Sequence, residues 1–137
     1  MSKLERFLTY GVSLFILASL LLTGCGTYRS QVRISWAGSS NSGRMAYRYK
    51  TFSGVERKNE RLEAGDTLIF EYDATVEEGT LTLQVEDPDD APLWETTLRE
   101  NGQDRVELTA EQAGTYTIVV EGDNTGGKFE VAWEVEE

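Results

Sequence analysis

The segment TLIFEYDATV, residues 67–76, decides the fold of this chain, because apolar and polar side chains alternate along its whole length. Successive side chains of a β-strand point to opposite faces of the sheet, so every second residue lies on the same face. One face of this segment is apolar or aromatic and consists of Leu68, Phe70, Tyr72, Ala74 and Val76. The segment therefore predicts a β-strand that buries one face in a core.

The same alternation recurs on both sides of this segment, in short runs separated by turn residues. These runs cover residues 32–36, 44–52, 80–86, 93–98, 105–109, 115–121 and 128–135. Together with residues 67–76 they give about eight strands, the pattern of an all-β, antiparallel β-sandwich of the jelly-roll type. A parallel sheet would require crossover helices, and we predict no helix after the N-terminal signal.

Two segments are harder to assign. Residues 37–43, with Gly, Ser and Asn, have the composition of a flexible loop. Residues 55–62 are highly charged but begin with Val55 and end with Leu62. We interpret them as an exposed edge strand, where charges oppose edge-to-edge pairing, in preference to a surface helical turn.

A short segment late in the chain supports the sandwich. LTAEQAGTYTIVV, residues 108–120, resembles a segment of small bacterial β-sandwiches such as pre-peptidase C-terminal domains and similar jelly-roll modules. The resemblance implies that Gly114 allows a tight turn into a strand and that the Tyr116 hydroxyl fixes this corner. It implies little about function, because sandwiches support many unrelated activities.

The first 24 residues have the three parts of an export signal. Lys3 and Arg6 lie in a weakly positive front part, and residues 12–22 are apolar and uncharged. That stretch is too short for a bilayer core of about 30 Å, which requires about 20 apolar residues. It ends in Leu22-Thr23-Gly24-Cys25, which resembles the lipobox of bacterial prolipoproteins.

This resemblance implies that a diacylglyceryl group is attached to the Cys25 thiol and that cleavage after Gly24 makes Cys25 the new N-terminus. The expected organisation is a signal peptide at 1–24, a lipidated tether at 25–30 and a β-sandwich domain at 31–137. Lipid would hold the domain on the extracytoplasmic face of a bacterial membrane, since two or three acyl chains anchor firmly. Gly26 stands where Asp would resemble an inner-membrane retention signal, which favours the outer membrane if the bacterium has two membranes.

Composition excludes several classes of function. Beyond the signal the chain carries 11 basic and 23 acidic residues, and so acidic a surface repels nucleic acid. The chain has one cysteine and no histidine, which excludes an intramolecular disulfide, His-dependent catalytic triads and His-ligated zinc. We therefore expect a protein that is not an enzyme and needs no cofactor.

Several carboxylates invite a functional interpretation, but each has an ordinary structural one. Asp87, Asp89 and Asp90 resemble the start of a calcium loop, yet the six to eight oxygen ligands that calcium takes are not completed. We interpret this segment as an Asp-Pro turn, and the pair Asp123 and Asn124 as part of a Gly-rich turn.

Glu71 and Asp73 lie on the outward face of one strand, with carboxylates about 6–7 Å apart. Such a separation brings glycosidase pairs to mind. Nothing in the sequence distinguishes them from acids on a solvated strand face, and we favour that interpretation.

The aromatic residues offer a possible ligand face for sugar stacking, formed by Trp94, Tyr47 and Tyr49. Trp36 and Trp133 occupy inward positions of their predicted strands, which favours core packing. Exposure of Trp94 together with Tyr47 or Tyr49 would favour a sugar-binding face, and burial of all three would count against it.

Two functional hypotheses follow. The first is a non-catalytic interaction or accessory module of the cell envelope, in which the basic segment 44–61 either steers an acidic protein partner or pairs with neighbouring acids. The alternative is a ligand-binding module for glycan or calcium, displayed at the membrane surface.

Overall fold

The computed structural model describes residues 31–137, which form a single unit. The predicted signal peptide, lipobox and tether, including Leu22, Thr23, Gly24 and Cys25, lie outside the described residues. Within the described range every regular element is a strand. That range accordingly contains no helix with the length and apolarity needed to cross a membrane.

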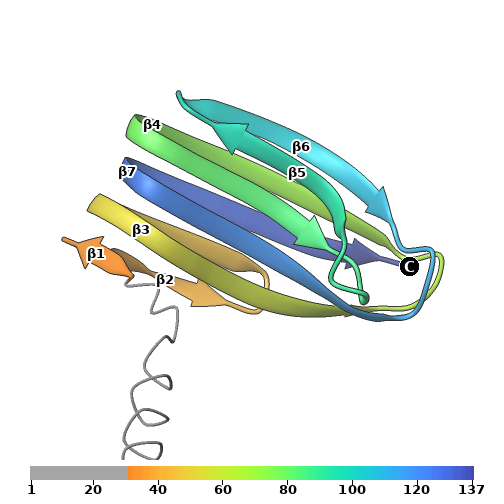
Figure 1. Cartoon of the computed structure of the whole chain (residues 1–137). Helices are drawn as coiled ribbons and strands as arrows, with labels where there is room; N and C mark the ends of the chain where they lie inside the picture. Colours follow the sequence, from red (N-terminus) through yellow and green to blue (C-terminus); the bar gives the residue numbers. More distant parts are fainter. Residues whose placement is uncertain (1–30) are drawn as a thin grey trace, which may run out of the picture. The chain divides into compact units, whose positions relative to one another are not determined.

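Seven antiparallel strands make up the fold (Figure 1). They are β1 Val32–Ile34, β2 Ala37–Asn41, β3 Arg44–Leu62, β4 Thr67–Glu86, β5 Pro92–Leu98, β6 Gly102–Thr109 and β7 Gly114–Glu136. The strand order is β1-β3-β7-β4-β5, with β2 also paired to β3 and β6 also paired to β4. The prediction of an all-β, antiparallel sandwich is confirmed.

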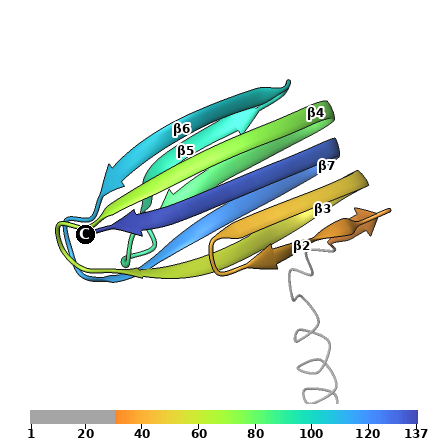
Figure 2. The ribbon, with the colours of Figure 1, turned by 180° about the vertical axis from the view of Figure 1, so that it is seen from behind.

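Three long strands, β3, β4 and β7, bend sharply and contribute one half to each of two layers. The first layer, in front in Figure 2, contains β2, residues 44–49 of β3, 127–136 of β7, 67–76 of β4, and β6. The second layer contains residues 54–62 of β3, 114–122 of β7, 80–86 of β4, and β5.

These bends correct the predicted number of strands. The segments that we interpreted as turns, residues 53–54, 77–79 and 122–127, are bends or bulges inside continuous strands. Register shifts mark them between Tyr49 and Gly54 of β3 and between Val76 and Thr80 of β4. Three pairs of predicted strands are therefore three strands. With the edge strand 55–62 counted, nine predicted segments become six strands, and β2, which we did not predict, makes seven.

The core lies between the two layers and contains the inward residues of the alternating segments. Phe70, Phe129 and Val131 are at most 2% exposed, as are Leu83 and Val120 from the opposite layer. The apolar face predicted for residues 67–76 is thus the buried face.

The start of the domain differs from its prediction. Val32 and Ile34 are 39% and 48% exposed, because β1 pairs only with the bend of β3 at residues 51–53. Ser35 then adopts a positive φ of 55° and redirects the chain. The predicted loop at 37–43 is wrong over most of its length, since Ala37–Asn41 forms β2 and pairs with β3.

The charged segment 55–62 is an edge strand, as predicted. It pairs with β7 on one side, and no other strand among the described residues pairs with it. Its side chains alternate between the polar outer surface and the rim of the core, where Glu60 accepts a 3.1 Å hydrogen bond from the Trp133 indole.

The corner before β7 contains the hydrogen bond that the sequence resemblance implies for Tyr116. Its hydroxyl donates to the Gln112 carbonyl at 2.8 Å. Gly114 has a φ of +154°, and a Cβ there would lie 2.7 Å from Cγ of Pro88. A larger residue at 114 would therefore strain the backbone and press on a rigid ring.

Candidate ligand-binding face

The three aromatic residues of the possible ligand face do not share an exposed surface. Tyr49 is only 4% exposed. Tyr47 and Trp94 are half-buried and pack against the core, with the Tyr47 ring 4.4 Å from that of Trp36 and the Trp94 ring 5.3 Å from that of Phe70. These residues stabilise the interior and form no platform for sugar stacking.

Tyr49 is a neutral core residue. Its hydroxyl and that of Thr125 are buried without a well-formed hydrogen bond. Burial raises the pKa of Tyr49 to about 12, and the nearby Thr125 hydroxyl opposes this rise in part. The phenol therefore stays protonated under ordinary conditions.

The acidic turns have internal partners. Asp87 accepts hydrogen bonds from the backbone amides of Asp89 and Ala91 at 2.9 and 3.0 Å, and Asp89 accepts one from the Gln112 side chain. The Asn124 amide donates to the Ser53 hydroxyl at 2.8 Å. Across residues 31–137, no group of three acidic, His or Cys side chains is placed to hold a metal ion.

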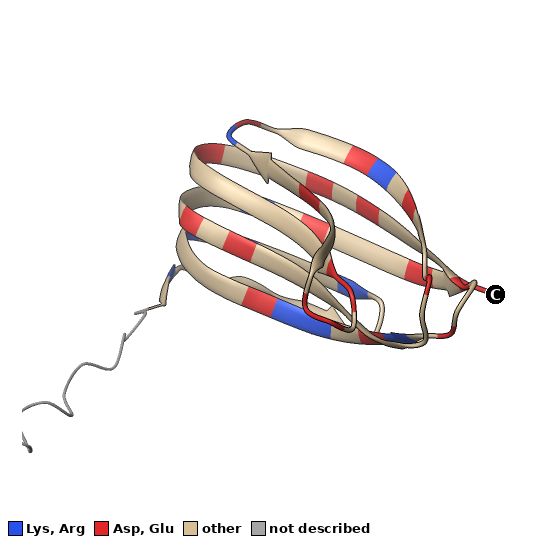
Figure 3. Cartoon of the chain, turned by 45° about the vertical axis from the view of Figure 1, so that its right-hand side comes forward, with Lys and Arg blue, Asp and Glu red and all other residues tan. Residues whose placement is uncertain are grey.

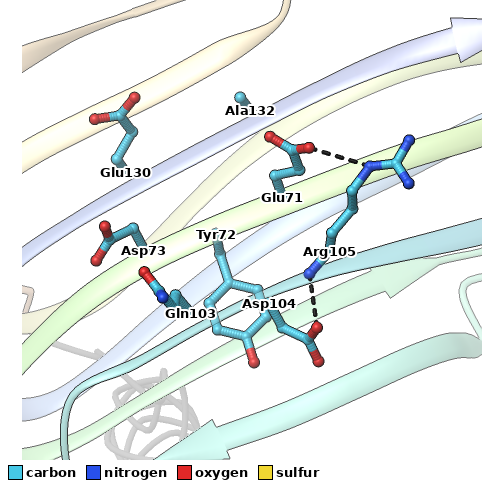
Figure 4. A pocket seen from close by; sticks show the side chains of 8 residues that line it. All are labelled: Glu71, Tyr72, Asp73, Gln103, Asp104, Arg105, Glu130 and Ala132. Carbon is cyan, nitrogen blue, oxygen red and sulfur yellow. Dashed lines mark hydrogen bonds and ion pairs between the residues drawn. The ribbon is translucent and has the colours of Figure 1, made fainter.

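The outer face of the first layer is different, because two hollows adjoin on it. One, of about 450 Å³, is lined by Glu71, Tyr72, Asp73, Gln103, Asp104, Arg105, Glu130 and Ala132 (Figure 4). The other, of about 400 Å³, is lined by Ala37, Gly38, Ala46, Tyr47, Arg48, Asp73, Lys128, Phe129 and Glu130. Asp73 and Glu130 line both, so the two hollows together cross the face from β2 to β6.

Strand register arranges the outward side chains in three rows across the layer. The first row is Ala37, Arg48, Lys128 and Thr75. The second row is Ser39, Ala46, Glu130, Asp73 and Gln103. The third row is Asn41, Arg44, Ala132, Glu71 and Arg105. Neighbouring strands are about 4.8 Å apart, so the first row, on four strands, is about 14 Å long, and the other two rows, on five strands, are each about 19 Å long.

Small and charged residues together shape this face. Ala46 and Ala132 leave the sheet uncovered between longer side chains. Ion pairs hold two of the arginines, since Arg105 contacts Glu71 at 3.1 Å and Arg44 contacts Glu130 at 3.0 Å. The result is a shallow, polar surface with carboxylates, guanidinium groups and an amide directed outward.

On the outer face of the second layer, polar side chains of different strands contact one another. Arg57 pairs with Glu86 at 3.5 Å, and the Thr82 and Thr97 hydroxyls are 3.1 Å apart.

Part of this site could be predicted from the sequence. Glu71 and Asp73 lie on one outward face, as predicted, and both line the larger hollow. The sequence did not indicate that Gln103, Glu130 and Lys128 belong to the site. Alternation shows that a residue points outward, but it does not show which strands are neighbours.

No protein-family model matches the chain, and no curated protein is similar to it at a significant level. Among solved structures, a CBM4 structure shares 11% identity over 77% of this chain and 77% of its own, with a TM-score of 0.51. A carbohydrate-binding module from Cellvibrio mixtus lichenase 5A, in complex with cellotriose, shares 11% identity over 80% of this chain and 91% of its own, with a TM-score of 0.45. At such identities the likeness to the CBM4 structure shows the β-sandwich fold alone.

Proposed function

We propose that this chain is a non-catalytic module that binds a glycan on the outer face of the first layer. The observation that carries the proposal is the pair of adjoining hollows on this face, which share Asp73 and Glu130. A CBM4 structure has a similar sandwich, so the architecture is compatible with carbohydrate binding.

The side chains of the face suit a polyhydroxylated ligand. Sugar hydroxyls both donate and accept hydrogen bonds, and carboxylates accept while guanidinium groups donate. Asp73 and Glu130 offer hydrogen-bond acceptors in the centre of the face, and the Gln103 side-chain amide offers both a donor and an acceptor. Without an exposed aromatic platform, binding depends on these polar groups, and hydrogen bonds with a charged partner are the stronger kind.

A protein partner is the less favoured function. Its main support was the basic segment 44–61, but neighbouring acids pair with Arg44, Arg57 and Arg61. The alternative we allowed for these residues, pairing within the domain, therefore accounts for much of the segment. The unpaired edge of residues 55–62 still offers backbone groups to an added strand.

Mutation of the outer face tests the proposal. Titration calorimetry of the purified full-length chain against a panel of neutral and acidic oligosaccharides is expected to find at least one that binds. Gln103→Ala and Glu130→Gln should each weaken that binding about 10-fold, the effect of losing one charge-assisted or well-placed hydrogen bond. Glu95→Gln, which alters an exposed acid on β5 outside both hollows, should leave it unchanged. Equal affinity in all three variants, or no binding to any sugar, would overturn the proposal.

We also propose that lipid on Cys25 holds this module on the extracytoplasmic face of a bacterial membrane. The support is the lipobox-like sequence Leu22-Thr23-Gly24-Cys25. Cys25→Ser should yield an unprocessed precursor that incorporates no labelled fatty acid, because the thiol that forms the thioether is gone. Normal processing and lipid incorporation in this variant would contradict the anchor.

A further inference from the structure

Two cations stand directly opposite each other on the proposed ligand-binding face. Arg48 of β3 is the register partner of Lys128 of β7, and both side chains are exposed. Directly opposed side chains on neighbouring strands have Cβ atoms about 4.5–5.5 Å apart, and like charges there destabilise the sheet. No ion pair within residues 31–137 involves either of them, whereas Arg44 and Arg105 on the same face each contact a carboxylate.

This pair is unusual for so acidic a protein. The chain has 13 basic and 24 acidic residues, and acidic positions are spread along the strands in Figure 3. Arg48 and Lys128 line the smaller of the two hollows and also a neighbouring one of about 380 Å³. A fold that tolerates two adjacent, unpaired cations beside open space offers a place for an anionic group.

We propose that the glycan bound by this face carries a carboxylate, as a uronic acid does, and that Arg48 and Lys128 bind this group. This inference rests on the proposed function of the face. The planar guanidinium of Arg48 can donate two parallel hydrogen bonds to a carboxylate, and the Lys128 ammonium adds a compact positive charge. Ala37 and Ala46 beside them leave room for the sugar ring that bears the acid.

The acids around the pair favour a carboxylate on a sugar over a phosphate. Asp73 and Glu130 lie in the adjacent row, about 7 Å along the strands, and Glu77 lines the hollow on the other side. These carboxylates repel a phosphate of nearly two charges more strongly than a carboxylate of one charge. They also accept hydrogen bonds from the hydroxyls of an adjoining sugar, which a bare phosphate ion lacks.

Matched acidic and neutral oligosaccharides test the inference. The full-length chain is titrated with tetragalacturonate, with a neutral cellotetraose of the same length, and with inorganic phosphate. We expect tetragalacturonate to bind about tenfold or more tightly than cellotetraose, the difference that one charge-assisted contact makes. Phosphate should compete only weakly.

Substitutions then assign the effect to the two cations. Arg48→Thr and Lys128→Thr should each reduce affinity for tetragalacturonate about tenfold, without a lower melting temperature, because each relieves a like-charge contact. Arg99→Thr makes the same change in net charge at an exposed residue outside the hollows and should have no effect on affinity.

The outcomes separate this inference from the function on which it rests. Equal affinity for the acidic and the neutral sugar would overturn the carboxylate site while leaving a glycan-binding face. So would a loss of affinity for tetragalacturonate in Arg99→Thr as large as that in Arg48→Thr or Lys128→Thr. Phosphate that competes as well as tetragalacturonate would overturn the assignment to a sugar acid. Absence of binding to every sugar tested would overturn both.

Discussion

Gly127→Ala is expected to destabilise the fold by about 3 kcal/mol or more, the combined effect of backbone strain and overpacking. Gly127 has a φ of +131°, and an added Cβ would lie 2.0 Å from the carbonyl oxygen of Thr75. That oxygen belongs to the backbone of β4 and has no freedom to move aside. The residue stands where β7 passes the bend of β4, so the clash acts on the junction that joins the two layers.

Urea unfolding of Gly127→Ala measures this loss, and Gly65→Ala is the matched control. Gly65 also has a positive φ, of +93°, but nothing lies within 4 Å of its Cβ position. It should lose only about 1 kcal/mol, from backbone strain alone. If the free energy of unfolding fell by the same amount in both variants, the tight contact between the bends of β4 and β7 would be contradicted.

Phe52→Ala is expected to cost about 3–5 kcal/mol, the range for removing a buried aromatic side chain. Phe52 is 0% exposed and lies at the bend of β3. Its ring is 4.8 Å from that of Trp36 and 5.4 Å from that of Tyr49. Truncation would therefore leave a cavity inside the aromatic cluster and loosen the packing of β1 against the domain.

The conservative variant Phe52→Leu serves as the control, because it keeps most of the buried volume and should lose less than half as much stability. Thermal unfolding followed by near-UV circular dichroism reports both the loss and the changed environment of the tryptophans. A melting temperature of Phe52→Ala within a degree of the original would contradict the placement of this ring in the core.

Much of the fold could be predicted because two-residue alternation reports directly on burial. Residues 67–76 and 128–135 have their apolar side chains on the face that the structure buries. The continuity of β3, β4 and β7 through their bends could not be predicted, because residues such as Gly79 and Gly122 are also typical of ordinary turns. Only contacts with neighbouring strands decide between a bend and a chain reversal.

The ends of the domain show a second limit. Residues 37–41 have a loop-like composition, yet they form β2 because the adjoining part of β3 offers free backbone groups. Val32 and Ile34 have the pattern of an inward face, yet they are exposed because β1 reaches only the bend of β3. Tertiary pairing overrides local preference in both cases.

The candidate site was the least predictable part. The outward direction of Glu71 and Asp73 followed from alternation, and both line the larger hollow. The proximity of Arg48 to Lys128, and of Asp73 to Glu130, depends on which strands are neighbours. Of the aromatic residues that the sequence offered as a possible ligand face, Tyr49 lies in the core, and Tyr47 and Trp94 pack against it.

The most direct test of the central claim is amide NMR of the isotopically labelled full-length chain during titration with a bound oligosaccharide. We expect the largest shift changes at outward residues of the first layer, namely Ala46, Arg48, Asp73, Gln103 and Glu130. Residues of the acidic turn 87–91 and of the outer face of the second layer should shift little. Shift changes concentrated at that turn or on the second layer, with the first layer unaffected, would contradict the account.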